Sequence, residues 1–123
     1  FLAVGIWMPA LTENFTGQEN LIFDGSPRSR LEARAIDTVC RFFPDLTAII
    51  IYLNLFPESA RHRLAARRRG DDATEAIKQR LRWFDEDVLP AVEHFRASSL
   101  YRFLDIDGEP AVDEIHQAIV SQL

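Results

Sequence analysis

The sequence lacks several features that would place it in a class at once. It has a single cysteine, Cys40, so an internal disulfide is excluded and a reducing cytosol is the expected location. No apolar run approaches the length of a membrane-spanning helix, and residues 47–55, the best candidate, are far too few. We therefore expect a cytoplasmic protein without a membrane partner.

Positive charge is also scarce. The net charge of −5 at pH 7 argues against binding of a nucleic-acid polymer, because such proteins normally present a basic face. The three histidines are widely separated and show no metal-ligand spacing. In contrast, 47% of the 123 residues are hydrophobic, which is enough for a core in one domain, or in part of one.

The order of apolar segments indicates an α/β domain with a parallel sheet and flanking helices. We expect strands at residues 20–24, 47–53 and 101–106. Helical spacing or a helix-starting proline predicts helices at about 29–43, 57–67, 73–87 (continuing to about 97) and 112–123. Ligands of parallel sheets bind beyond the carboxyl ends of the strands. Asp24 and the turn Gly25–Arg28 are expected at such an end.

Arginines cluster in one part of this acidic chain. The segment Arg63–Asp72 and the nearby Arg80 place five arginines around two adjacent aspartates. A planar guanidinium suits phosphate oxygens, and several of them would serve phosphoryl transfer, which depends on positioning and charge stabilisation. The alternative is a solvated helix end with local ion pairs, each worth about 0–1 kcal/mol.

Three segments in this order resemble the adenylate kinase family of nucleoside monophosphate kinases. Asp24–Ser29 is similar to the family's Asp-Gly-Phe-Pro-Arg-Thr signature. Arg63–Asp72 is similar to its Arg-Leu-x-x-Arg-Gly-Arg-x-Asp-Asp segment, and Glu75–Leu81 matches the Glu-x-Ile-x-x-Arg-Leu that follows. The resemblance covers about residues 21–123. It implies a fold like that of P-loop kinases.

The resemblance implies a nucleotide-binding role for several residues. Arg28, in the turn that Gly25 begins, would hold the phosphate of the monophosphate acceptor. Asp24 would help to hold the hydrated Mg²⁺ that accompanies ATP. Arg63 would lie near the adenine and phosphates of the donor, and the backbone at Gly108 would run beside the donor adenine.

The resemblance also implies catalytic residues. Arg67, Arg69 and Arg80 match arginines that surround the transferring phosphoryl group, and Asp71 matches an aspartate that pairs with them. Preorganised cations of this kind stabilise the negative charge of the transferring group.

Glu32 departs from the family pattern, because a glutamine that reads the acceptor adenine commonly stands there. A carboxylate only accepts hydrogen bonds. It could accept from the exocyclic amine of adenine, or it could favour a base with two donors, such as guanine. The acceptor base is therefore open.

The family's phosphate-binding loop, Gly-x-x-x-x-Gly-Lys-Ser/Thr, is absent from these residues. Gly5–Pro9 resembles part of the family's monophosphate-binding region. We therefore expect residues 1–123 to be the C-terminal major part of a single kinase domain, without its N-terminal strand and helix and with a reduced lid near residues 66–73. We expect a preceding portion, because a sheet without its central strand leaves ladder groups unpaired.

Two hypotheses follow. The first is a monomeric nucleoside monophosphate kinase that transfers a phosphoryl group reversibly from ATP–Mg to AMP, giving two ADP. The second is a non-catalytic remnant or interaction module of the same fold.

Overall fold

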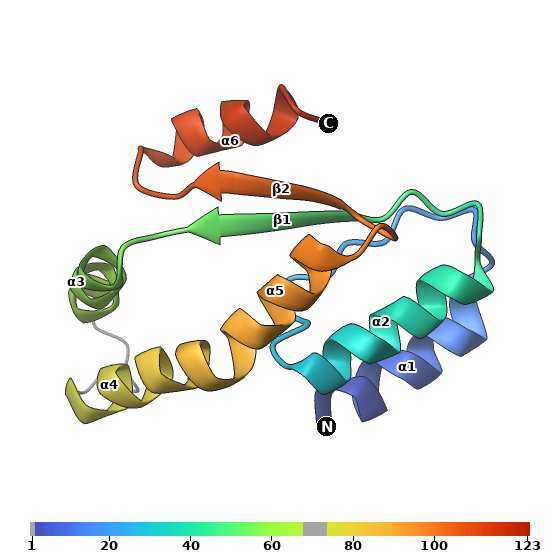
Figure 1. Cartoon of the computed structure of the whole chain (residues 1–123), viewed down its shortest axis with the longest axis horizontal. Coiled ribbons are helices and arrows are strands. Elements are labelled where there is room, and N and C mark those ends of the chain that lie inside the picture. Colours follow the sequence, from blue (N-terminus) through green and yellow to red (C-terminus); the bar gives the residue numbers. More distant parts are fainter. Residues whose placement is uncertain (1, 68–73) are drawn as a thin grey trace. The chain divides into compact units, whose positions relative to one another are not determined.

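The computed structural model describes residues 2–67 and 74–123. Its regular elements alternate helices with two strands along the chain (Figure 1). They are α1 (Leu2–Asn14), α2 (Arg30–Phe42), β1 (Ile49–Asn54), α3 (Pro57–Arg67), α4 (Thr74–Trp83), the π-helix Phe84–Val88, α5 (Leu89–Ala97), β2 (Arg102–Asp107) and α6 (Val112–Val120). The chain divides into two compact units, which are described separately.

The first unit consists of residues 1–48 and 87–102. Helix α2 contacts both α1 and α5. Leu11, Phe15 and Val39 form a buried cluster between α1 and α2, and the Phe15 and Phe43 rings meet edge to face with centroids 5.0 Å apart. On α5, Ala91, Val92 and Phe95 are buried. Apolar side chains at helical spacing thus build this unit.

The second unit consists of residues 49–86 and 103–123. Strands β1 and β2 pair as a two-stranded parallel sheet, with both arrows pointing the same way in Figure 1. The Gly108 N–H donates to the Asn54 carbonyl at 2.7 Å and extends the ladder past the strand ends. Leu104 and Ile106 are buried while their neighbours are more exposed, the alternation of a strand with one buried face. Helix α3 contacts α4.

The predicted α/β class with a parallel sheet and flanking helices is confirmed. Helices α2 to α6 and both strands lie within a few residues of their predicted positions. The strand predicted at residues 20–24 is wrong, because residues 20–23 have no regular structure and residues 24–25 form a bend. Strands need hydrogen-bonded neighbours, and in the described ranges the sheet contains β1 and β2 alone. Helix α1 was not predicted, and it carries Pro9 in its interior.

Candidate functional site

The turn that precedes α2 is fastened to that helix by one buried carboxylate. Glu32, whose side chain is almost fully buried, accepts hydrogen bonds at Oε2 from the Arg28 backbone N–H at 2.6 Å and from the Ser26 hydroxyl at 3.0 Å. Ser29 is the N-cap of α2, and its hydroxyl accepts from the Glu32 N–H at 3.3 Å. The acid and the cap together fix the backbone from Ser26 to Glu32.

The Arg28 guanidinium folds back over Gly25. Gly25 has a φ of +73°, and a β-carbon there would lie 2.7 Å from Arg28 Nη2. Both Asp24 and Arg28 are exposed. Within residues 2–67 and 74–123, the structure gives neither side chain a hydrogen bond or ion pair. This turn therefore leaves a guanidinium and a carboxylate exposed on a backbone that Glu32 and Ser29 hold.

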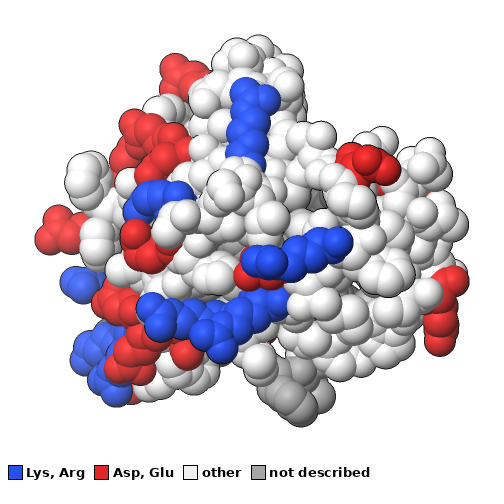
Figure 2. Space-filling view, turned by 45° about the vertical axis from the view of Figure 1, so that its right-hand side comes forward, with Lys and Arg blue, Asp and Glu red and all other residues white. Residues whose placement is uncertain are grey.

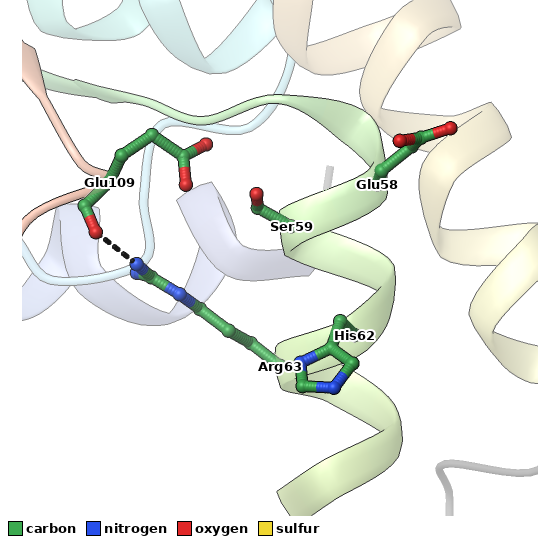
Figure 3. Close-up of a pocket in the computed structure, with 5 residues that line it drawn as sticks. All are labelled: Glu58, Ser59, His62, Arg63 and Glu109. Atoms are coloured by element: carbon green, nitrogen blue, oxygen red, sulfur yellow. Dashed lines mark hydrogen bonds between the residues drawn. The ribbon is translucent and has the colours of Figure 1, made fainter.

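A second set of predicted residues lies at the carboxyl ends of the strands in the other unit. Arg63, on α3, donates from Nη1 to the Gly108 carbonyl at 2.8 Å and from Nη2 to the Glu109 carbonyl at 2.7 Å. Figure 3 shows the guanidinium reaching from α3 to Glu109. An open cavity of about 370 Å³ is lined by Glu58, Ser59, His62, Arg63 and Glu109 (Figure 3).

Gly108 is required where it lies. A β-carbon at this position would lie 2.9 Å from the Asn54 carbonyl oxygen and 3.0 Å from Leu55. The turn after β2 can therefore approach the connection between β1 and α3 only with glycine there. A second cavity, of about 380 Å³, is lined by residues of the same strand ends, namely Asn54, Leu55, Phe56, Asp105, Asp107 and Glu109.

The predicted site residues thus fall into two sets. Gly25, Arg28, Asp24 and Glu32 come together in the first unit, and Arg63, Arg67, Arg80 and Gly108 belong to the second. Arg67 is the last residue of α3, and Arg80 lies in the last turn of α4. Arg69, Asp71 and most of the reduced lid expected near residues 66–73 lie outside the described residues.

Sequence reasoning missed a polar cluster around Asp37. One oxygen of this carboxylate accepts from the Tyr101 hydroxyl at 2.6 Å, and the other lies 2.8 Å from His94 Nε2. Burial, with the hydrogen bond to Asp37, raises the pKa of Tyr101, and burial also raises the pKa of the Cys40 thiol. The partners of Asp37 are 57 and 64 residues away along the chain, so no local motif could indicate this cluster.

Acidic and basic side chains of the described residues lie interspersed on the face that Figure 2 shows. Among the described residues, no group of three or more His, Cys, Asp or Glu side chains could hold a metal ion. None of the described helices is long and apolar enough to span a membrane.

The sequence is similar to curated proteins named adenylate kinase or UMP-CMP kinase, which are nucleoside monophosphate kinases. The chain is 32% identical over 88 residues to an adenylate kinase of Prochlorococcus marinus (strain MIT 9515), covering 72% of this chain and 48% of that protein. It is 29% identical over 110 residues to an adenylate kinase of Stenotrophomonas maltophilia (strain R551-3), covering 85% and 57%. It is 27% identical over 103 residues to UMP-CMP kinase 3 of Oryza sativa subsp. japonica, covering 82% and 47%.

These similarities fit a fragment of the adenylate kinase family. The chain spans about half the length of the curated relatives it matches. No family model matches it.

Proposed function

We propose that the protein is a nucleoside monophosphate kinase that transfers the terminal phosphoryl group of ATP–Mg to a nucleoside monophosphate, with AMP as the principal acceptor. With AMP the products are two ADP, and the reaction is reversible. The similarity to proteins named adenylate kinase and UMP-CMP kinase supports the class of reaction.

The observation that carries the proposal is the turn around Arg28. Its backbone is fixed by Glu32, and its exposed guanidinium lies over Gly25. A planar guanidinium with open donors, carried on a fixed backbone, suits two oxygens of a phosphate monoester, which it can bind bidentately. Arg28 would therefore hold the acceptor phosphate and orient one of its oxygens toward the donor.

The remaining residues would serve the transfer itself. An oxygen of the acceptor phosphate forms a bond to the terminal phosphorus of ATP, and the bond from that phosphorus to the bridging oxygen of ADP breaks. Arg67, Arg69 and Arg80 would stabilise the charge on the transferring group, with Asp71 keeping them oriented. Arg63 and Gly108 would border the donor nucleotide.

Magnesium enters as part of the substrate ATP–Mg. Asp24 is exposed, and in the described part of the chain it has no hydrogen-bond or ion-pair partner, so its carboxylate can accept from metal-bound water. A single carboxylate fits this water-mediated contact better than a direct protein cage, since Mg²⁺ keeps several waters when it binds with a nucleotide.

The test is phosphoryl transfer by the product of the complete gene. ATP–Mg is mixed in turn with AMP, GMP, CMP or UMP, and the diphosphate products are measured. We expect ADP to form fastest with AMP. The absence of transfer to all four acceptors would contradict the proposal and favour a non-catalytic module of the same fold.

Arginine substitutions then test the catalytic assignment. Arg69→Ala or Arg80→Ala should lower kcat by about 10²-fold or more and change both KM values little, because a lost transition-state interaction has this signature. Arg82→Ala is the matched control, since Arg82 lies two residues from Arg80 on α4 and is exposed. Equal turnover of all three variants would return Arg69 and Arg80 to ordinary surface ion pairs.

A further inference from the structure

Helix α3 is held in an unusual way for a helix that carries functional residues. None of its residues is buried, and only Ser59, Ala60 and Leu64 are partly covered. Most helices in proteins are fixed by an apolar face packed against the core. Beside its contact with α4, α3 therefore depends for its position on polar contacts at its start and along its side.

Those contacts come from the turn that follows β2. The carboxylate of Glu109 accepts a hydrogen bond from the Phe56 N–H at 2.8 Å. The Phe56 carbonyl in turn accepts from the Ala60 N–H at 3.0 Å and so begins α3. A carboxylate at this place satisfies a backbone donor at the start of the helix and has a favourable interaction with the helix dipole.

The same turn is also held from the side by Arg63, about two helical turns after Phe56. Its two terminal nitrogens donate to the consecutive carbonyls of Gly108 and Glu109. Glu109 therefore holds α3 at two places: its side chain binds the N–H of Phe56, the residue directly before α3, and its backbone carbonyl binds Arg63. These two separated contacts restrain both the position and the direction of the helix.

The turn itself is fixed to the sheet. The Gly108 N–H bonds to the Asn54 carbonyl at 2.7 Å, and the Glu109 N–H donates to Asp107 Oδ1 at 3.0 Å. The chain of contacts thus runs from β1 and β2 through the turn to α3. Helix α3 ends at Arg67, directly before the segment that contains Arg69.

We propose that Glu109 is a positioning residue for phosphoryl transfer: it fixes the start of α3 on the strand ends and thereby sets where Arg67, at the end of α3, meets the transferring phosphoryl group of the donor. This role rests on the proposed kinase function. It also gives Arg63 a specific task, since both terminal nitrogens of its guanidinium are committed to backbone carbonyls rather than offered to phosphate oxygens.

The test compares three variants in the product of the complete gene. Glu109→Ala removes the acceptor, and Glu109→Gln keeps an oxygen that can accept from the Phe56 N–H. Asp113→Ala is the matched control, because it deletes an exposed carboxylate in the first turn of α6. Steady-state kinetics with ATP–Mg and AMP are measured together with amide hydrogen exchange of residues 56–64.

We expect Glu109→Ala to lower kcat/KM for the donor by about 10-fold or more, since a misplacement of about 1 Å can cost as much as 10²-fold. The acceptor KM should stay unchanged, and exchange in α3 should become about 10-fold faster. Glu109→Gln should restore both measurements to within about threefold of the wild type, and Asp113→Ala should change neither.

The outcomes separate this role from the proposed function. Unchanged exchange in Glu109→Ala would show that Glu109 does not hold α3, whatever the activity, and would overturn the proposal. Faster exchange with unchanged kinetics would show that the contacts of Glu109 are only structural, which overturns the positioning role. A wild type without phosphoryl transfer would remove the proposed function, and the exchange data would still decide whether Glu109 holds α3.

Discussion

Arg28 and Arg63 belong to motifs of the same kind, but the two compact units hold them in opposite ways. In the first unit, a carboxylate binds the backbone: Glu32 accepts from the Arg28 N–H, and the Arg28 side chain stays exposed. In the second unit, the arginine itself binds the backbone, because Arg63 donates to the carbonyls of Gly108 and Glu109. A motif arginine can thus either keep its guanidinium exposed or use it to hold the backbone of another segment.

The sharpest test of this difference is Arg28→Lys. Lysine keeps the positive charge but loses the planar fork. The acceptor KM should therefore rise by about 10- to 100-fold, which corresponds to the free energy of one hydrogen bond to a charged group. The donor KM should change little. Arg30→Lys is the control, because Arg30 is exposed at the first residue of α2. Equal effects on both nucleotides would mean that Arg28 supports the structure as Arg63 does.

The two glycines beside these arginines should respond differently to alanine. At Gly108 the new β-carbon would lie 2.9 Å from a backbone oxygen, which can move only with the turn, so we expect a loss of about 1–3 kcal/mol in the free energy of unfolding. At Gly25 it would meet the end of the flexible Arg28 side chain, and the positive φ should cost about 1 kcal/mol.

Thermal and denaturant unfolding measure the stability of both glycine variants, and kinetics separate their functional effects. Gly25→Ala should raise the acceptor KM, because its β-carbon displaces the Arg28 guanidinium. Gly108→Ala should affect the donor instead. A Gly25→Ala variant with unchanged acceptor binding would show that the observed place of Arg28 over Gly25 is not used for binding.

The elements were predictable from sequence where the signal is local. Pro57 marks the start of α3, and helical apolar spacing predicted α2, where Ile36 and Val39 are buried but Leu31 and Phe42 are exposed. The prediction of a strand at residues 20–24 was wrong because an apolar run does not show whether a neighbouring strand is present to pair with it. In the folded chain this run is not buried in a sheet, and Ile22 is 92% exposed. The continuous apolar character around Pro9 gave no helical periodicity for α1.

The site was predictable only as a set of residue types. Motifs indicated Arg28 and Arg63, but the distinction between them depends on contacts with Glu32, four residues along, and with Glu109, 46 residues away. Asp37 and Tyr101 are 64 residues apart and have no shared motif. Long-range polar contacts of this kind need the folded chain.

Tyr101→Phe tests the polar cluster around Asp37 in the first unit. Loss of the hydrogen bond to Asp37 should lower the free energy of unfolding by about 1 kcal/mol at pH 7. The pKa of Tyr101 is raised in the folded chain above its ordinary 10.0, so the unfolded chain loses this proton first as pH rises. The wild type should therefore lose stability above about pH 10.

The phenylalanine variant lacks this source of alkaline destabilisation. The stability difference between the two proteins should therefore shrink between pH 9 and pH 11, as measured by denaturant unfolding at each pH. A difference that stays constant over this range would show that the phenol of Tyr101 titrates alike in the folded and unfolded chain.

The smallest effect should come from Glu32→Gln. This variant distinguishes two roles of Glu32, namely fixing the Arg28 turn and recognising the acceptor base. An amide oxygen can still accept from the Arg28 N–H and the Ser26 hydroxyl, so the turn should persist. Because Oε2 of Glu32 already accepts both of these bonds, we expect the ratio of kcat/KM for AMP to that for GMP to change by less than about threefold. A residue that reads the base would discriminate by about 1–3 kcal/mol through the partner left unpaired. A shift of about 10-fold toward AMP would therefore show that Glu32 turns to the acceptor base, as the family resemblance implies, and that the Arg28 turn is held in another way once the nucleotide is bound.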